Sequence, residues 1–574
     1  MIKTTQYIQL SLLMLLLFIL FIFSAYGISS QAKSESFEKI QKVTFDAGYE
    51  VIENKEILVV TDNDEVLSHL EQELSYMKKG YLVKDSLFSV TKDEGRNLRI
   101  IILASETMKN SYDLSTVKSY LNKGVNIIFA ILPVQEIDDD WKSLLGIDEI
   151  NDKVRQDGII TFKGFFLGGK QDYENLVVDA PYTKVASTCK TYIVGYKEKK
   201  SDYNVKEYEF MYDIVWRNIY QGSQIYVING YSINQFGVGI LSAIFAQIYP
   251  DYLYPVINAK TLIINNAPYF SNENNDEMMS RYSRKAVRFF NDLVLPNIIS
   301  INLTYNCVPT LYGISGFDKN VAEGDDYDTA ILPLLQNSMS RMGGEIGISA
   351  YDLQHSAPKQ KVLDDIQLYE KHLGEFSLRS LNVSNYDQSA RAYLIDEVEK
   401  RMPLYSVVSF WDDGATFSYY NDNIVNVPII SRGFEYTEDE YIKLQGMATA
   451  LGVISHEVDM ADIIFPKGSN DDWTNAVKDL SSFVDSYWKP YKTFSSMNIT
   501  QMSLRVARFI NMSPDITVKD NVIKVNINNF NTEAYFVLRT GKEIMKITNG
   551  SYNIIEDGSY LIIAKDASLT IELE

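Results

Sequence analysis

Cysteine and histidine are scarce in this chain. Its 574 residues include two cysteines, Cys189 and Cys307, and four histidines. The two cysteines fall in different predicted domains, so the sequence encodes neither a disulfide framework nor a CxxC metal site. The first predicted strand is followed by no G-x-G-x-x-G stretch, so its tip lacks the glycines that a dinucleotide or flavin phosphate needs.

Positive charge is in deficit. Lysine and arginine number 54 against 75 aspartates and glutamates, for a net charge of −21. Such a surface repels phosphate backbones and anionic lipid head groups, which excludes nucleic acid as a partner. A cationic polymer suits it better.

Tryptophan is also rare, with 5 residues, whereas tyrosine reaches 39 and phenylalanine 27. Tyrosine rings are flat and amphipathic, as in the clefts of sugar-binding proteins. An AT-rich codon bias, which enriches Tyr, Asn, Ile and Lys throughout a chain, explains the same count equally well.

One long apolar run lies near the N-terminus. Ile8 to Tyr26 ("IQLSLLMLLLFILFIFSAY") has the length of a membrane-spanning helix, and Lys3 precedes it. This pattern predicts a cell-membrane protein with the bulk of the chain extracytoplasmic. No cysteine follows the run, which excludes a lipoprotein. We expect residues 1–29 to be an uncleaved anchor, with a cleaved signal as the alternative, and residues 30–53 to be a polar tether.

The rest of the chain divides into three predicted domains. In residues 54–256, apolar runs such as "EILVV" and "LRIIILA" alternate with helical segments, which predicts a doubly wound parallel α/β domain of the amidotransferase or flavodoxin type. Its Cys189 lies in a predicted strand and its His69 on a surface helix, so neither resembles a nucleophile with its base. Residues 257–492 predict a β/α barrel with strands near 261, 298, 346, 405, 427 and 452. Residues 493–574 predict an antiparallel β-sandwich with Asn-Gly and Asp-Gly turns.

The first barrel strand ends in an unusual pair. "TLIINNAPYF" places Asn265 and Asn266 where many barrel enzymes hold a metal or a catalytic acid. Amide side chains donate and accept hydrogen bonds but cannot act as a base. They would suit sugar hydroxyls, whereas the alternative is that both simply cap the following turn.

The order of these segments, with "YPVINAKTLIINNAP", "GGEIGISAYDLQH" and "GVISHEVDMAD", resembles a family of bacterial extracytoplasmic proteins. The barrel is similar to the deacetylase part of the Pel-type exopolysaccharide machinery and to polysaccharide deacetylases. The resemblance implies paired aspartates, two metal-binding histidines and a late catalytic histidine.

Most of those positions are altered in this chain. The paired acids fall on Asn265 and Asn266, the late motif keeps His456 and Asp462, and Asp459 stands where the pattern favours another histidine. At the other positions where the family motif has a histidine, this chain has Gly344, Ser349 and Leu353.

The chain still contains residues of the types that bind a metal ion. His355 and His456 with one carboxylate from Glu345, Asp352 or Asp459 would form a two-histidine, one-carboxylate site, with zinc as the ion of an active enzyme. His456 and Asp459 would then be the catalytic residues. Satisfied or solvent-facing imidazoles are the alternative, and in that case no cofactor is expected.

A second motif lies later in the barrel. "SFWDDGATF" resembles the strand-end "TFDDG" of active deacetylases and places Trp411, Asp412 and Asp413 near the barrel mouth. Paired acids before glycine also form ordinary turns. The predicted carbohydrate-binding residues are Asn265, Asn266, Tyr269, Trp411, Asp412 and Asp413.

Three functions fit this pattern. The first is a membrane-anchored, catalytically inactive deacetylase-like protein that binds or guides an exported polysaccharide, one that the resemblance implies is partly de-N-acetylated and cationic. The second is an active, metal-dependent polysaccharide N-deacetylase with atypical ligands. The third is a structural partner that docks a membrane synthase or export protein without touching sugar.

Overall fold

The computed structural model describes Met14, Lys42 and residues 55–198, 208–229, 238–317, 329–351, 358–373, 378–435, 437–468 and 471–574. The predicted anchor at 1–29 and the tether at 30–53 lie outside these residues, apart from Met14 and Lys42. None of the helices described has both the length and the apolar character that a bilayer crossing requires.

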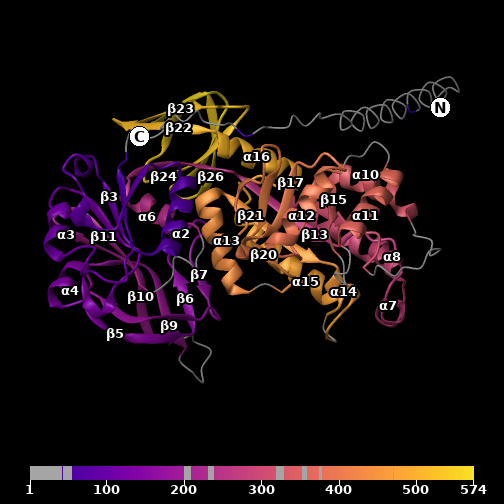
Figure 1. Ribbon diagram of the computed structural model, residues 1–574, viewed down its shortest axis with the longest axis horizontal. Coiled ribbons are helices and arrows are strands. Elements are labelled where there is room, and N and C mark those ends of the chain that lie inside the picture. The colour runs from indigo at the N-terminus through magenta and orange to yellow at the C-terminus, as the bar shows by residue number, and fades with distance from the viewer. Residues whose placement is uncertain are drawn as a thin grey trace, which may run out of the picture.

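The N-terminal sheet begins as predicted. Five parallel strands run in the order β2-β1-β3-β4-β11, with helices α2 (Asp64–Tyr76), α3 (Leu114–Leu121) and α6 (Ile240–Ile248) around them (Figure 1). The central strands are almost wholly Ile, Val, Leu and Phe because helices bury both faces of the sheet. The five strands are β1 (Ile57–Val60), β2 (Tyr81–Lys84), β3 (Ile100–Leu103), β4 (Asn126–Phe129) and β11 (Ser223–Ile228).

The other half of this sheet is antiparallel, so the prediction of a purely doubly wound sheet is wrong here. Only Gln221 and Gly222 join β10 to β11, and both have positive φ, which produces a tight hairpin and leaves no room for a crossover helix. His69 is exposed on α2, as expected, whereas Cys189 lies in a turn just before β9. The antiparallel strands are β10 (Tyr208–Tyr220), β9 (Lys190–Glu198), β6 (Gly158–Thr161) and β7 (Gln171–Tyr173), and β5 (Ile147–Gln156) pairs separately with β8 (Val178–Val185).

The second large sheet is a curled β/α half-barrel. Its parallel strands are covered by helices that precede or follow each of them, and the strand pair β19 (Val425–Ile429) and β20 (Ser431–Arg432) curls the sheet back on itself. Here β19 pairs with β17 while β20 pairs with β21, at the opposite end of the strand order. The other parallel strands are β13 (Ala259–Asn265), β14 (Pro309–Gly313), β15 (Glu345–Ser349), β16 (Ser380–Asn382), β17 (Ser406–Phe410) and β21 (Val453–Asp459).

Two barrel elements differ from the sequence prediction. The strand expected near 298 is helix α9 (Leu295–Tyr305), with Pro296 in its first turn, and the strand of that repeat is β14. A short Ile-rich run fits strand and buried helix equally by periodicity, and only the surrounding packing separates them. Strand β16 was not predicted because three residues carry no pattern. The helices of this part are α7 (Asn275–Tyr282), α8 (Ala286–Phe289), α9, α10 (Leu332–Met342), α11 (Pro358–Leu373), α12 (Gln388–Glu399), α13 (Glu438–Leu451), α14 (Ala461–Ile464) and α15 (Trp473–Phe483).

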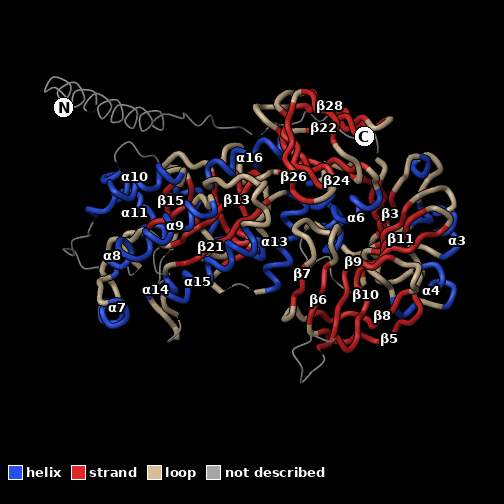
Figure 2. The backbone as a smooth tube through the Cα atoms, turned by 180° about the vertical axis from the view of Figure 1, so that it is seen from behind, coloured by secondary structure: helices blue, strands red, loops and turns tan. Residues whose placement is uncertain are grey.

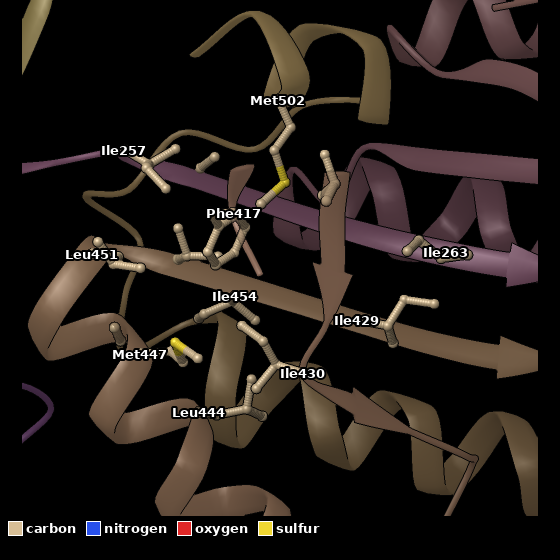
Figure 3. Close-up of a cluster of buried hydrophobic side chains, with 14 of the residues drawn as sticks. Ile257, Ile263, Phe417, Ile429, Ile430, Leu444, Met447, Leu451, Ile454 and Met502 are labelled. Carbon is tan, nitrogen blue, oxygen red and sulfur yellow. The ribbon is translucent and has the colours of Figure 1, made fainter. Parts of the chain in front are cut away.

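One buried cluster joins the barrel to the helices around it. Leu444, Met447 and Leu451 of α13 lie against Ile454 of β21, and Met502 of α16 (Ile499–Asn511) approaches from the other side (Figure 3). All five side chains are almost completely buried. This packing fixes β21, which carries the principal candidate residues.

The C-terminal residues form two four-stranded antiparallel sheets that lie over the junction between the α/β part and the barrel (Figure 2). Strand β12 (Asp251–Val256), which leads into the barrel, joins one of them through β24. The Asp557-Gly558 pair joins β26 to β27 as a hairpin, whereas Asn549 joins strands of different sheets. The strands are β22 (Ser513–Lys519), β23 (Val522–Asn528), β24 (Ala534–Thr540), β25 (Ile544–Thr548), β26 (Gly550–Glu556), β27 (Ser559–Ala564) and β28 (Ser568–Leu573).

Candidate functional site

The candidate site lies where β13 and β21 end, side by side. Asn265 pairs in register with Asp459, and Ile263 with Glu457. Partners in parallel strands share a face, and residues two apart along a strand share it as well. Asn265, Asp459 and Glu457 therefore lie on one face, and it is the inner one, because Glu457 reaches Asn382 on β16, four places away in the sheet order.

Asn266 bridges the carboxyl ends of three strands. Its backbone adopts the left-handed conformation (φ 55°), which asparagine tolerates better than most residues. Its side-chain amide donates to Asp459 Oδ1 at 2.7 Å, and its carbonyl accepts from Ser349 Oγ at 2.8 Å. The amide is fully buried and both its functions are used, so Asn266 holds the site together and contributes no free group.

Asn265 has the opposite character. Its side chain is 0% exposed, and neither its oxygen nor its nitrogen has a hydrogen-bond partner within the described ranges. A buried amide without partners costs on the order of 1–3 kcal/mol, so a bound water or ligand group is the expected complement. It lies one strand from Asp459, at the same level of the barrel.

Two carboxyl groups stand close together on β21. Asp459 is partly exposed, accepts hydrogen bonds from Asn266 and the backbone N–H of Ala461, and has its pKa raised to about 6, chiefly by burial. Glu457 is buried, and burial followed by the nearby charge of Asp459 raises its pKa to about 8. The amide of Asn382 donates to Glu457 at 2.6 Å. Around neutral pH, Asp459 is thus the more readily ionised of the two.

His456 turns to the outer face of the barrel. It is fully buried, its ring stacks on Phe483 at 3.8 Å, and its Nδ1 lies 2.8 Å from Ser431 Oγ. Burial lowers its pKa to about 3, so the imidazole is neutral. Residues 456 and 459 lie three apart on a strand, so their side chains point to opposite faces. The two residues predicted to be catalytic, His456 and Asp459, therefore lie on opposite faces of β21.

Among the predicted metal ligands that the structure describes, Glu345, His456 and Asp459 do not come together. Glu345 lies at the start of β15, at the amino end of the barrel, where its carboxylate accepts from Ser380 Oγ and from the backbone N–H of Thr500. His355 and Asp352 lie outside the described residues. Across the described ranges no group of three His, Cys, Asp or Glu side chains could hold a metal ion, and the unpartnered group at the strand ends is a neutral amide. The described residues alone therefore do not fit a zinc site.

The predicted aromatic residues are divided between core and edge. Tyr269 is 1% exposed, donates to Ala286 O and packs against Phe290 and Phe317, so its ring is not available to a ligand. Trp411 is half-buried in the short 3₁₀ helix Trp411–Asp413 that follows β17, with its ring 6.4 Å from that of Phe417. It therefore remains at the carboxyl edge of the barrel.

Asp412 is an exposed partner of Lys443 at 2.8 Å, and the side chain of Asp413 lies outside the description. Next to them, the Arg432 guanidinium lies 4.4 Å from the ring centre of Phe410, and Arg432 pairs in register with Glu457. The Trp411 segment and β21 are thus linked through Phe410 and Arg432.

Several residues of this edge were not singled out from the sequence, namely Glu457, Asn382, Arg432 and Phe410. A signal for Glu457 was present, because "HEVD" at the end of an apolar strand alternates and places both acids on the same face. Asn382 carried no such signal, since its contact with Glu457 crosses the barrel.

A family model described as "Uncharacterised protein conserved in bacteria (DUF2194)" matches residues 209–561, more than half of the chain. The chain belongs to the DUF2194 family. The matched residues include β13, β21 and every side chain of the candidate site. No curated protein sequence matches the chain significantly.

Among solved structures, this DUF2194 protein is similar in fold to one described as "Agd3 a novel carbohydrate deacetylase", with a TM-score of 0.53, 10% sequence identity, and 91% of this chain and 98% of that chain covered. A putative glycoside hydrolase/deacetylase from Parabacteroides distasonis also matches, with a TM-score of 0.29, 8% identity, and 50% and 82% of the two chains covered. The first of these likenesses gives the chain a deacetylase-like fold.

Proposed function

We propose that this DUF2194 protein binds a polysaccharide during exopolysaccharide synthesis or export, and that its deacetylase-like barrel does not carry out metal-dependent hydrolysis. The observation that carries this is the structure at the strand ends. Asn266 is held by Asp459 and Ser349, Asn265 presents an unpartnered amide, and His456 faces away. Such a site offers hydrogen bonds without a metal-activated water.

The surroundings support a carbohydrate ligand. Trp411 and Phe410 place partly exposed rings at the carboxyl edge, where such folds bind ligands. Sugar rings pack their C–H faces on aromatic side chains and direct their hydroxyls to amides and carboxylates. The membrane anchor predicted at residues 1–29 would keep this site beside a membrane synthase or export protein, on the extracytoplasmic side.

The test separates binding from hydrolysis. The full chain, purified in detergent, is incubated with zinc, cobalt or manganese, freed of loosely held ions, and assayed for bound metal and for acetate release from N-acetylated oligosaccharides. We expect no retained metal and no acetate, but measurable glycan binding. About one ion per chain, lost in His355→Ala or His456→Ala, would instead establish a metalloenzyme.

Binding should also depend on Trp411. Trp411→Ala is expected to weaken glycan binding by about two- to tenfold, the equivalent of about 0.5–1.5 kcal/mol for one ring contact, without lowering the unfolding temperature by more than a few degrees. Phe88→Ala, which removes an exposed ring in the α/β part, is the matched control. Equal loss in both variants would remove the barrel edge as the binding site.

A further inference from the structure

The carboxyl edge of the barrel contains an acid, Asp459, that forms no ion pair with any lysine or arginine among the described residues. Asp459 Oδ1 accepts two hydrogen bonds, from Asn266 and from the N–H of Ala461. In the described part of the chain, no lysine or arginine forms an ion pair with this carboxylate, although Asp412 and Asp462 each have one. Asp459 is therefore fixed in position by neutral donors and keeps its charge available to a ligand.

The cationic side chains near Asp459 already have partners. Lys443 pairs with Asp412, Lys467 lies 3.9 Å from Asp462, and Arg432 stacks on Phe410. Asn266 has used both ends of its amide. The amide of Asn265, which pairs with Asp459 in register, is fully buried and has no hydrogen-bond partner among the described residues, and the same holds for the hydroxyl of Tyr312, which pairs with Asn265 in register.

Asp459 and Asn265 make complementary demands on a ligand. Asp459 requires a positive charge, and the Asn265 amide requires a neutral donor or acceptor next to it. A sugar with an ammonium group on the carbon beside a hydroxyl meets both demands within one ring. A ring that carries an N-acetyl group offers no charge, and a uronate ring offers the wrong one.

We propose that the barrel edge selects amino sugars with a free amine, such as glucosamine or galactosamine, through an ion pair between the sugar ammonium and Asp459, with Asn265 bonding the neighbouring hydroxyl or the water that bridges to it. This inference rests on the proposed polysaccharide-binding function. The negative charge of Asp459 at the site then has the same sign as the net charge of the whole chain.

The experiment compares pentasaccharides by calorimetric titration of the full chain in detergent at pH 7. The ligands are glucosamine, galactosamine, N-acetylglucosamine, glucose and a uronate, each as a β-linked or natural oligomer. We expect an amino-sugar pentamer to bind at least about tenfold more tightly than its N-acetylated or neutral counterparts, and the uronate to bind least.

The decisive variant is Asp459→Asn. Its amide oxygen can still accept from Asn266 and Ala461, so the fold is retained while the charge is lost. The variant should lose the tenfold preference and bind the N-acetylated and neutral pentamers as the parent does. Asp485→Asn, which removes an exposed acid paired with Lys489, is the control for net charge and should keep the preference.

Other outcomes have defined meanings. Equal binding of charged and acetylated sugars, or equal loss of all ligands in Asp459→Asn, overturns amine recognition and leaves polysaccharide binding in place. A preference for the uronate overturns it as well and would direct attention to Arg432. Binding of none of the five pentamers overturns this inference together with the proposed function.

Discussion

Glu457 is a carboxyl residue of the barrel whose ionisation the fold opposes. It is 3% exposed, and burial raises its pKa from the ordinary value of about 4.5 to about 8. A carboxyl that prefers to be neutral when folded makes the free energy of unfolding fall as pH rises from about 4.5 to about 8, because ionisation is easier in the unfolded chain.

Glu457→Gln should therefore stabilise the protein at alkaline pH. Glutamine cannot ionise, and its oxygen still accepts from Asn382. At pH 8 we expect a gain on the order of a few kcal/mol, and almost none at pH 4, measured by urea unfolding at both values. Glu543→Gln, at an exposed position, is the control. A variant with the same pH dependence as the parent would show that Glu457 ionises freely in the barrel.

At the scale of elements, α13 connects the parts of the molecule. Its Gln445 accepts from Tyr173 Oη at 2.7 Å and donates to Leu167 O, both in the α/β part, while its apolar side packs on β21 (Figure 3). The helix begins with a capping box in which Thr437 and Glu440 exchange hydrogen bonds. Its placement therefore affects both the domain contact and the site strand.

Removing that cap should weaken the helix measurably. Thr437→Ala is expected to lower the free energy of unfolding by about 1 kcal/mol, because one backbone N–H at the helix start loses its acceptor. Thr437→Ser keeps the hydroxyl and should stay close to the parent. Chemical denaturation of the three proteins checks this, and equal stability of all three would mean that water replaces the cap at no cost.

At the scale of the whole molecule, Arg539 joins the C-terminal sheets to the α/β part. It is 7% exposed and donates to Phe165 O at 2.6 Å and Gly164 O at 2.7 Å. Both acceptors lie 374 and 375 residues away along the chain. Together with the Gln445 contacts, this arginine fixes the C-terminal sheets over the domain junction.

Arg539→Met should loosen this junction. Two backbone carbonyls lose a charged donor, which costs on the order of 2–4 kcal/mol, and amide hydrogen exchange should accelerate around residues 164–168. Arg539→Lys can restore one bond and should fall between the two. Unchanged exchange in the methionine variant would mean that the apolar contacts alone hold the sheets in place.

The sequence alone determined the elements with strong patterns. Continuous apolar runs predicted the parallel strands β1, β3, β4, β13 and β21, because strands buried on both faces must be apolar throughout. The order of the segments and their motifs resembled a deacetylase-like barrel, and the Asn265-Asn266 pair indicated altered strand ends. The antiparallel half of the first sheet and helix α9 were missed, since their periodicity fits more than one structure.

Only the tertiary structure decided which side chains meet. Because successive side chains of β21 point to opposite faces of the sheet, His456 points outward to Phe483 while Glu457 and Asp459 point inward. The motif match could not distinguish these two directions. Curling of the sheet brings Asn382, from a strand too short to predict, against Glu457. Asn265, Asn266 and Tyr269 follow one another closely in the sequence, yet the fold makes one an unpartnered amide, one a bridge and one a core residue, because burial and partners are set by strands distant in the chain.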